Sequence, residues 1–191
     1  MIIVKSYEIQ DSEFTTNITE DDEAIWNVGF TYASGDRVIL NTYVYESLQA
    51  GNTGNDPQSS PTWWAVVSRT NPYRLFDRII GGTPSSKSDE ITVTIDSGKI
   101  VSSVGLFNVD AATVQCTVTH SVDGVVFDET ISLQDNSGIF DLYDYYFAPV
   151  STKDSVIFTD MPSYVGDVDL TITKDGGTAS VGEIIPGFQY S

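Results

Sequence analysis

Cysteine and histidine are almost absent from this chain of 191 residues. Cys116 is the only cysteine, which excludes an internal disulfide and any zinc site made from the cysteines of one chain. His120 is the only histidine, so a histidine zinc site or a Ser-His-Asp triad would depend on that residue alone. No G-x-S-x-G motif accompanies it, and its place on the apolar side of a strand end favours a structural role. We therefore expect a protein that is not an enzyme.

Basic residues are scarce as well. The chain has 9 lysines and arginines against 27 acidic residues, which gives a formal net charge of -18. Such a surface repels the phosphate backbone, so we expect no nucleic-acid partner. The acidic residues are dispersed except at 21–23, which indicates a solvated surface and not a disordered acidic tail. Hydrolysis by two carboxylates stays open because so many pairs exist, but no motif supports it.

Long hydrophobic runs are missing from the start of the chain. "MIIVKSYEIQDSE" has only three apolar residues between Met1 and Lys5. This is too short for the apolar region of a secretory signal or for a membrane span. We therefore expect neither a signal peptide nor a membrane-spanning segment.

What the sequence does contain is short alternation of apolar and polar residues, bounded by Gly, Asp, Asn and Pro. In the run 113–120, Val114, Cys116 and Val118 point to one side, which is typical of a strand with one buried face. Asp123-Gly124 then predicts a hairpin turn into the next strand. The pattern indicates an all-β protein.

Further strands are expected at residues 90–95, 100–109, 141–150, 154–160, 167–174 and 178–188. Their regular spacing, without helical connections, predicts an antiparallel, jelly-roll-like β-sandwich within residues 68–191. We expect Val104, Leu106 and Ile157 in its core, together with the inward side chains of the run 113–120.

The N-terminal quarter has a different composition. Residues 1–24 predict an extended arm with at most an edge strand. The arm combines apolar "MIIV" and "YEI" with an acidic run, so we expect it to pair with an adjacent subunit or another protein. Residues 25–67 form an aromatic-rich segment near the lower size limit for independent folding, with no disulfide to stabilise it.

The aromatic segment needs its own core. We expect that core to contain Trp26, Tyr32, Val38, Tyr45 and one of Trp63 and Trp64. Adjacent residues of a strand face opposite sides, so the other tryptophan is free for a contact.

One set of residues in this segment carries a resemblance: Trp26, Tyr32, Gly35-Asp36-Arg37-Val38, Tyr45-Glu46-Ser47, Gly51, Gly54, Pro57 and Trp63-Trp64. The segment resembles the small chitin-binding-type carbohydrate module of bacterial chitinases, which is reused in bacteriophage proteins. It departs from that pattern at Asn41-Thr42, where the module usually has Asn-Gly.

The remainder of the chain carries a second resemblance, through "TNPYRLFDRIIGG", "VSSVGLFNVDAATVQCTV", "FTDMPSYVGDVDLTIT" and "ASVGEIIPGF". It is similar to a recurrent family of tailed-bacteriophage virion proteins in which that module precedes a galactose-binding-like sandwich. The resemblance implies a non-enzymatic tail, neck or baseplate component that contacts other virion proteins and its own copies in a symmetric ring. It also implies a location in the virion after synthesis in the host cytoplasm.

A carbohydrate-binding module that recognises host-surface glycans is the alternative. Aromatic rings stack on the apolar face of a pyranose, and Tyr43, Trp63 and Trp64 are the candidates for a sugar or subunit contact. In so small a segment the same rings are also the available core.

No cofactor is required by any motif. Calcium is the one metal to consider, because the turns at 135–138, 166–169 and 175–177 are rich in oxygen ligands. None has the EF-hand spacing, and turn-forming Asp and Asn explain these segments equally well. We therefore expect no metal site.

Overall fold

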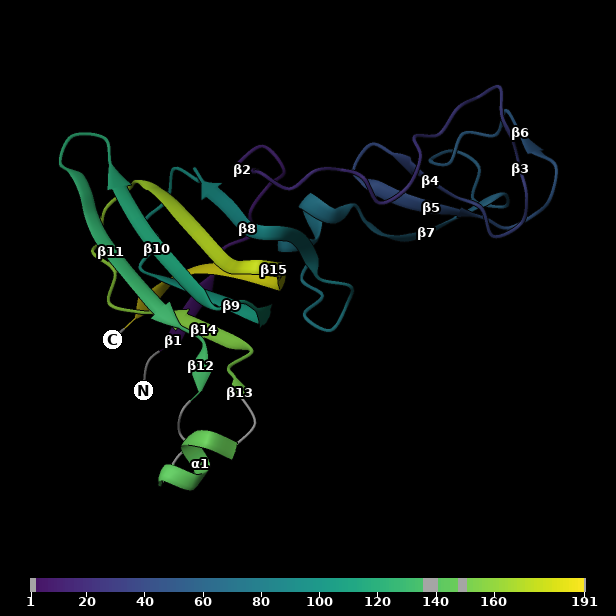
Figure 1. Ribbon diagram of the computed structural model, residues 1–191. Helices are drawn as coiled ribbons and strands as arrows, with labels where there is room; N and C mark the ends of the chain where they lie inside the picture. The colour runs from purple at the N-terminus through teal and green to yellow at the C-terminus, as the bar shows by residue number, and fades with distance from the viewer. Residues whose placement is uncertain (1–2, 136–140, 148–150, 191) are drawn as a thin grey trace.

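The structure is a computed structural model that describes residues 3–135, 141–147 and 151–190. Its elements in chain order are β1 (Ile3–Ser6), β2 (Phe14–Thr16), β3 (Thr31–Tyr32), β4 (Arg37–Leu40), β5 (Tyr43–Ser47), β6 (Asn52–Thr53), β7 (Trp64–Arg69), the 3₁₀ helix η1 (Asn71–Phe76), β8 (Ser85–Ile95), β9 (Ser103–Asp110), β10 (Thr113–His120), β11 (Gly124–Ser132), β12 (Gln134–Asp135), α1 (Leu142–Phe147), β13 (Ser151–Thr152), β14 (Ser155–Phe158) and β15 (Asp167–Tyr190). The predicted all-β, antiparallel sandwich is confirmed (Figure 1).

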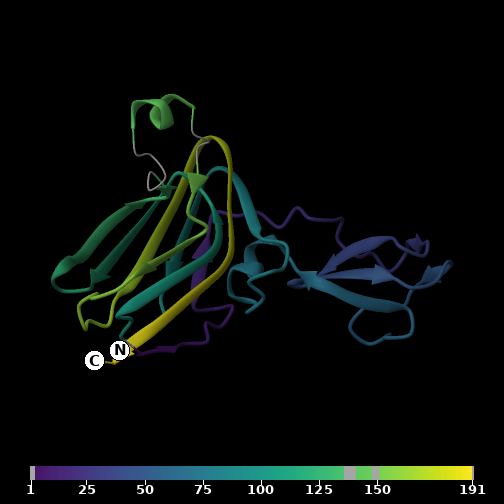
Figure 2. The same cartoon turned by 90° about the horizontal axis from the view of Figure 1, so that it is seen from below.

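Strand β15 joins the two layers of the sandwich. Its first half, from Asp167 to Lys174, lies between β10 and β8. Its second half pairs with β9 from Ser180 to Gly187 and with β1 at its end. The register shifts between the two halves, and the strand bends there (Figures 1 and 2). The segments expected as two strands, 167–174 and 178–188, are therefore one strand.

The core lies between these layers. Val104, Leu106, Val114, Cys116 and Val118 are all buried in it, as the alternation predicts.

Ile157 is the exception, because its side chain is 56% exposed while its neighbours Val156 and Phe158 are buried. Its predicted place in the core is wrong. A strand alternates its faces with a period of two, so a choice that is wrong by one residue reverses every side chain.

The N-terminal residues do not form a free arm. Strand β1 pairs with the end of β15, and β2 pairs with β8. Ile9, Phe14 and Ile18 are buried in the same core as the rest of the sandwich. The expectation that residues 1–24 find no place on their own monomer is wrong, because two sheet edges of this chain supply the hydrogen bonds and burial they need.

Residues 141–150 were expected as a strand, but Leu142–Phe147 form the helix α1, and 148–150 lie outside the described residues. This segment extends beyond the short β12–β13 ladder, away from the sheet edges (Figure 1). Without a neighbouring strand, a helix satisfies the backbone locally. Across the described ranges, no helix has the length and apolar character needed to cross a bilayer.

The buried thiol of Cys116 gives a test of the sandwich. Burial, together with the charges of Glu129 and Asp169, raises its pKa to about 12. Since the thiolate is the reactive form, a bulky disulfide reagent at pH 8 should leave the native protein unlabelled and label one thiol per chain in urea. Fast labelling without denaturant would contradict the observed packing.

Candidate functional site

The aromatic segment has a small core of its own, distinct from that of the sandwich. Tyr32, Val38, Tyr45 and Trp64 are buried together, built on the three-stranded sheet β4-β5-β7 and the β3–β6 pair. The Tyr32 and Trp64 rings meet edge to face at 5.1 Å, and the Trp64 Nε1–H donates to the carbonyl of Asn55. We call residues 25–69 the aromatic module.

The predicted members of this core are placed as follows. Tyr32, Val38 and Tyr45 lie in it, Trp26 packs against it with partial burial, and Trp64 is the tryptophan that faces inward.

The contact residues have a mixed outcome. Trp64 is only 3% exposed, so its proposed contact with a sugar or a subunit is wrong. Trp63 and Tyr43 are half-buried and pack against the same cluster. The Tyr43 ring is also covered by the Arg69 guanidinium, 5.1 Å from its centre. A contact role for Tyr43 and Trp63 stays a prediction, but neither ring is a free flat platform.

The hairpin between β4 and β5 shows how the chain turns at Asn41-Thr42 without a glycine. Leu40 pairs with Tyr43, which leaves Asn41-Thr42 as a two-residue turn. Asn41 has a φ of 55°, in the left-handed region. Asparagine tolerates this conformation better than most residues, so the turn forms without a glycine.

Large apolar side chains are exposed on the aromatic module and on the loop that follows it. They are Ile25, Val28, Phe30, Leu48, Val66, Val67, Ile79 and Ile80. All are aliphatic except Phe30. Ile25 and Phe30 border a depression of about 510 Å³, whose polar lining includes Asn27, Asp36 and Arg37.

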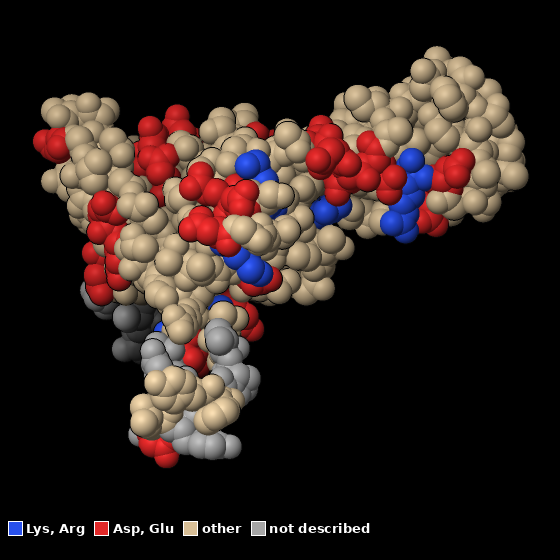
Figure 3. All heavy atoms as spheres, in the orientation of Figure 1, with Lys and Arg blue, Asp and Glu red and all other residues tan. Residues whose placement is uncertain are grey.

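The connection between the aromatic module and the sandwich is held by charges. Arg74 is buried and pairs with Asp22 at 2.5 Å, and the backbone N–H of Asn71 donates to the same carboxylate. Arg69 pairs with Asp11 at 2.6 Å. Asp22 belongs to the acidic run at 21–23, which was expected to be solvated. It is instead a partly buried ion-pair partner of Arg74. Figure 3 shows red atoms outnumbering blue on the visible face, where basic groups lie beside acidic ones.

The loop after η1 carries a second polar cluster. Glu183 of β15 is only 2% exposed, and its Oε2 accepts the N–H of Arg78 at 2.6 Å. Asp77 accepts the N–H of Ile79 at 2.8 Å, and its negative charge acts on Glu183. Burial, together with the charge of Asp77, raises the pKa of Glu183 to about 7. Burial also raises the pKa of Asp77.

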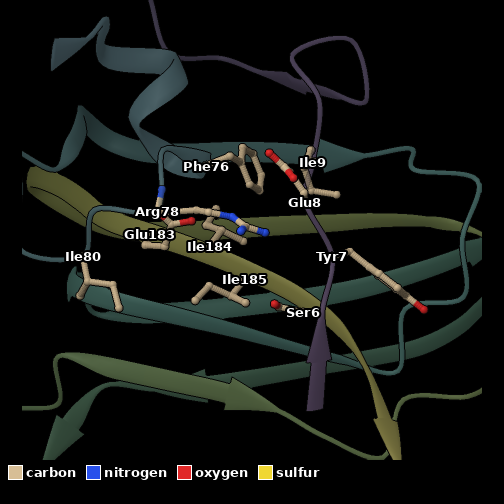
Figure 4. A pocket seen from close by; sticks show the side chains of 10 residues that line it. All are labelled: Ser6, Tyr7, Glu8, Ile9, Phe76, Arg78, Ile80, Glu183, Ile184 and Ile185. Carbon is tan, nitrogen blue, oxygen red and sulfur yellow. The ribbon is translucent and has the colours of Figure 1, made fainter.

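A pocket of about 200 Å³ lies beside this cluster (Figure 4). Phe76, Ile184 and Ile185 form apolar parts of its wall. Figure 4 shows the Arg78 side chain extending across the pocket toward the segment that carries Tyr7. The pocket lies where the loop after η1, strand β15 and the residues after β1 meet.

Sequence reasoning missed Asp77, Arg78 and Glu183. They match no spacing motif, since Arg78 and Glu183 are 105 positions apart. One signal was present: Glu183 is the single charged residue in the otherwise uncharged run "ASVGEIIPGF". A charge in such a run needs a partner, although the run does not identify it.

His120 lies at the end of β10. Its Nδ1 is 2.9 Å from a carboxylate oxygen of Asp123, and its ring is 4.9 Å from that of Tyr164. These contacts tie the hairpin to a neighbouring loop, in keeping with a structural role.

The acidic turns considered for calcium are partly engaged in hydrogen bonds. Asp169 accepts the Thr94 hydroxyl at 2.6 Å, and the N–H of Gly176 donates to Asp89. The segment 135–138 lies mostly outside the described residues. Among those that are described, no group of three His, Cys, Asp or Glu side chains has the arrangement of a metal site.

No protein-family model matches the chain, and no curated protein matches it. Several similar solved structures are carbohydrate-binding modules with a β-sandwich fold. The family 32 CBM from C. perfringens NanJ in complex with galactose is 15% identical, with a TM-score of 0.44, over 97% of this chain and 100% of that chain. Chitosan-binding module 1 of a chitosanase/glucanase from Paenibacillus sp. IK-5 is 17% identical, with a TM-score of 0.37, over 62% and 83%.

The similar structures also include XRCC1 bound to the DNA pol beta catalytic domain, which is 14% identical with a TM-score of 0.39 over 59% of this chain and 83% of that chain. Similarity at this level does not carry a function to this chain.

The two tryptophans should differ in their contribution to stability. Trp64→Ala should cost about 3–5 kcal/mol and unfold the aromatic module, because it removes the largest buried ring of a small core. Trp63→Ala should cost clearly less. Urea titration followed by near-UV circular dichroism compares the two variants, and equal costs would show that the observed difference in burial does not govern stability.

The buried Arg74–Asp22 pair should matter more than the exposed Arg37–Glu46 pair. Arg74→Met leaves Asp22 unpaired and should cost about 3–5 kcal/mol, whereas Arg37→Met should cost about 0–1 kcal/mol. Adding Asp22→Asn to Arg74→Met should restore part of the loss. Calorimetry of the full chain measures this, and wild-type stability of Arg74→Met would contradict it.

Proposed function

We propose that this protein is a non-enzymatic structural component of a tailed-phage virion, in the tail, neck or baseplate region. Its task is to contact neighbouring virion proteins, with its copies arrayed in a symmetric ring. The phage assignment rests on the sequence resemblance described above, which extends over most of the chain.

The exposed side chains of the aromatic module support contacts with proteins in particular. A partner that covers exposed apolar side chains removes them from water, which favours association. A sugar-binding face instead needs flat aromatic rings, and here Trp64 is buried while Trp63 and Tyr43 are half-buried in packing. The exposed apolar side chains of the module and the following loop are aliphatic except for Phe30. This chemistry fits a protein surface better than a pyranose.

The module that carries these exposed side chains is tied to the sandwich. The Arg69–Asp11 pair joins its last residue to the N-terminal segment, and the Arg74–Asp22 pair joins the two chain segments that flank it. This chain carries a net charge of -18. Contact with a positively charged neighbouring protein is therefore favoured over close packing of its own copies alone.

Substitutions on the aliphatic surface test the proposal. Ile25→Asp together with Val66→Asp should leave the protein folded but reduce its incorporation into particles by about 30-fold or more, as loss of central interface residues does. Val122→Asp is the control, because Val122 is 83% exposed on the β10–β11 hairpin of the sandwich. Quantitative mass spectrometry of purified particles gives the readout. Equal incorporation of both variants would overturn the proposed contact surface, and absence of the wild-type protein from particles would overturn the virion role.

Recognition of host-surface glycans is the second candidate function. It is favoured by Phe30, whose exposed ring borders a depression that also offers Asn27, Asp36 and Arg37 as hydrogen-bonding groups. Titration with chitin oligosaccharides and host glycans should then change tryptophan fluorescence in the wild type and not in Phe30→Ala. No change with any of these glycans would remove this candidate and leave the assembly role.

A further inference from the structure

The loop from Asp77 to Gly82 is attached to the sandwich by the carboxyl group of Glu183 and the side-chain amide of Asn108, while Asp77 holds the loop internally. Glu183 accepts the N–H of Arg78, and Asp77 accepts the N–H of Ile79. The loop directly follows η1, which itself follows β7 of the aromatic module. Its attachment therefore affects the end of the connection between module and sandwich.

Close backbone approach adds to this attachment. A Cβ at Gly182 would lie 2.9 Å from the carbonyl oxygen of Ile80 and 2.7 Å from Cβ of Asn108. The side-chain amide of Asn108 donates to the same carbonyl at 3.3 Å. The loop thus lies directly on β15, at the residue before Glu183.

The loop conformation is strained at Arg78. Its φ of 65° lies in the left-handed region, which is unfavourable for a residue other than glycine. The hydrogen bond from its N–H to Glu183 holds it in this conformation.

The charges around Glu183 come from several elements. Asp77 and Arg78 belong to the loop, and Arg69 and Arg74 act on Asp77 from β7 and η1. Glu8, after β1, lines the adjoining pocket. Within the described part of the chain, the Arg78 guanidinium forms no ion pair of its own. If Glu183 ionises, a second negative charge arises beside Asp77 in a buried site, where it is poorly solvated.

We propose that the loop Asp77–Gly82 is a proton-dependent latch, in which a proton on buried Glu183 keeps the loop on β15 by avoiding a second negative charge beside Asp77, and its loss loosens the loop. Residues of the loop line two hollows, so its release widens both. One is the pocket of about 200 Å³ beside Glu183, and the other is a groove of about 460 Å³ that Asp22, Arg74 and Ile79 line. It also frees the end of η1, so the aromatic module gains freedom relative to the sandwich.

The direction of the pH effect follows from the burial of Glu183. Its pKa in the docked loop, about 7, lies above the ordinary value of 4.5, so docking favours the protonated form. The latch is therefore fully effective below about pH 4.5, weakens as the pH rises toward 7 and reaches a constant, weaker level above 7.

Arg78 makes the latch measurable by limited proteolysis. The rate at which trypsin cuts the full chain after Arg78 should be divided by its rate on a free peptide of residues 76–84 at each pH. This ratio should rise about tenfold or more between pH 5.5 and 7 and then level off, since one pKa unit corresponds to a tenfold change. A constant ratio from pH 5.5 to 8 would overturn the latch.

Two variants separate the latch from general effects of pH. Glu183→Gln keeps a hydrogen-bonding group without a charge, so its ratio should stay low at every pH. Glu46→Gln, at an exposed position of β5, should keep the wild-type rise. A wild-type rise in Glu183→Gln would contradict the proposal.

Amide exchange of the wild-type protein gives an independent measurement, should Glu183→Gln fail to fold. Followed by NMR, the protection factors of the Arg78 and Ile79 amides should fall between pH 5.5 and 7, while those of β10 stay constant. Unchanged protection at Arg78 and Ile79 would overturn the latch.

Discussion

The rest of this structure depends on the pairing of the long strand β15. This strand is hydrogen-bonded to β10, β8, β9 and β1, and through them it connects elements from both ends of the chain. Because it bends between Lys174 and Thr178, one strand contributes to both layers, and the apolar faces of the two layers enclose one core. The pairing of β1 with the end of β15 also brings the described N-terminal and C-terminal ends together (Figures 1 and 2). A chain without disulfides thus gains its stability from hydrogen-bonded strands and burial.

The aromatic module shows what a small core requires. Four buried side chains make up its centre, too few to hold a segment of this size with a large margin. Two features compensate. Its turns are formed by residues that accept left-handed conformations, such as Asn41, and its connection to the sandwich is fixed by the buried Arg74 and its partner Asp22. The consequence is that nearly all of its aromatic rings serve packing, which leaves aliphatic side chains as its exposed apolar surface.

The proposed contact role and the proposed latch involve different parts of the chain. The aromatic module offers an apolar surface, whereas the sandwich offers the support on which that surface is mounted. The loop from Asp77 to Gly82 lies at the end of the connection, and a buried carboxyl group holds it. A buried carboxyl group is an unfavourable choice for stability alone, since burial penalises its charged form. Its contact with the loop that follows η1 is what makes it a candidate for regulation.

Local patterns in the sequence determined the strand class and much of the core. Val114, Cys116 and Val118 are buried because a strand alternates its faces, and that rule needs no knowledge of the partner strand. Tertiary structure decided which of two neighbouring residues faces inward. Trp64 is buried and Trp63 is not, and Val156 and Phe158 are buried whereas Ile157 between them is exposed. It also decided that residues 141–147 lack a sheet partner and that the N-terminal residues pair within their own chain. The meeting of Arg78 with Glu183, 105 positions away, could not be read from the sequence, because the short-range spacing of residues does not specify contacts made by folding of the whole chain.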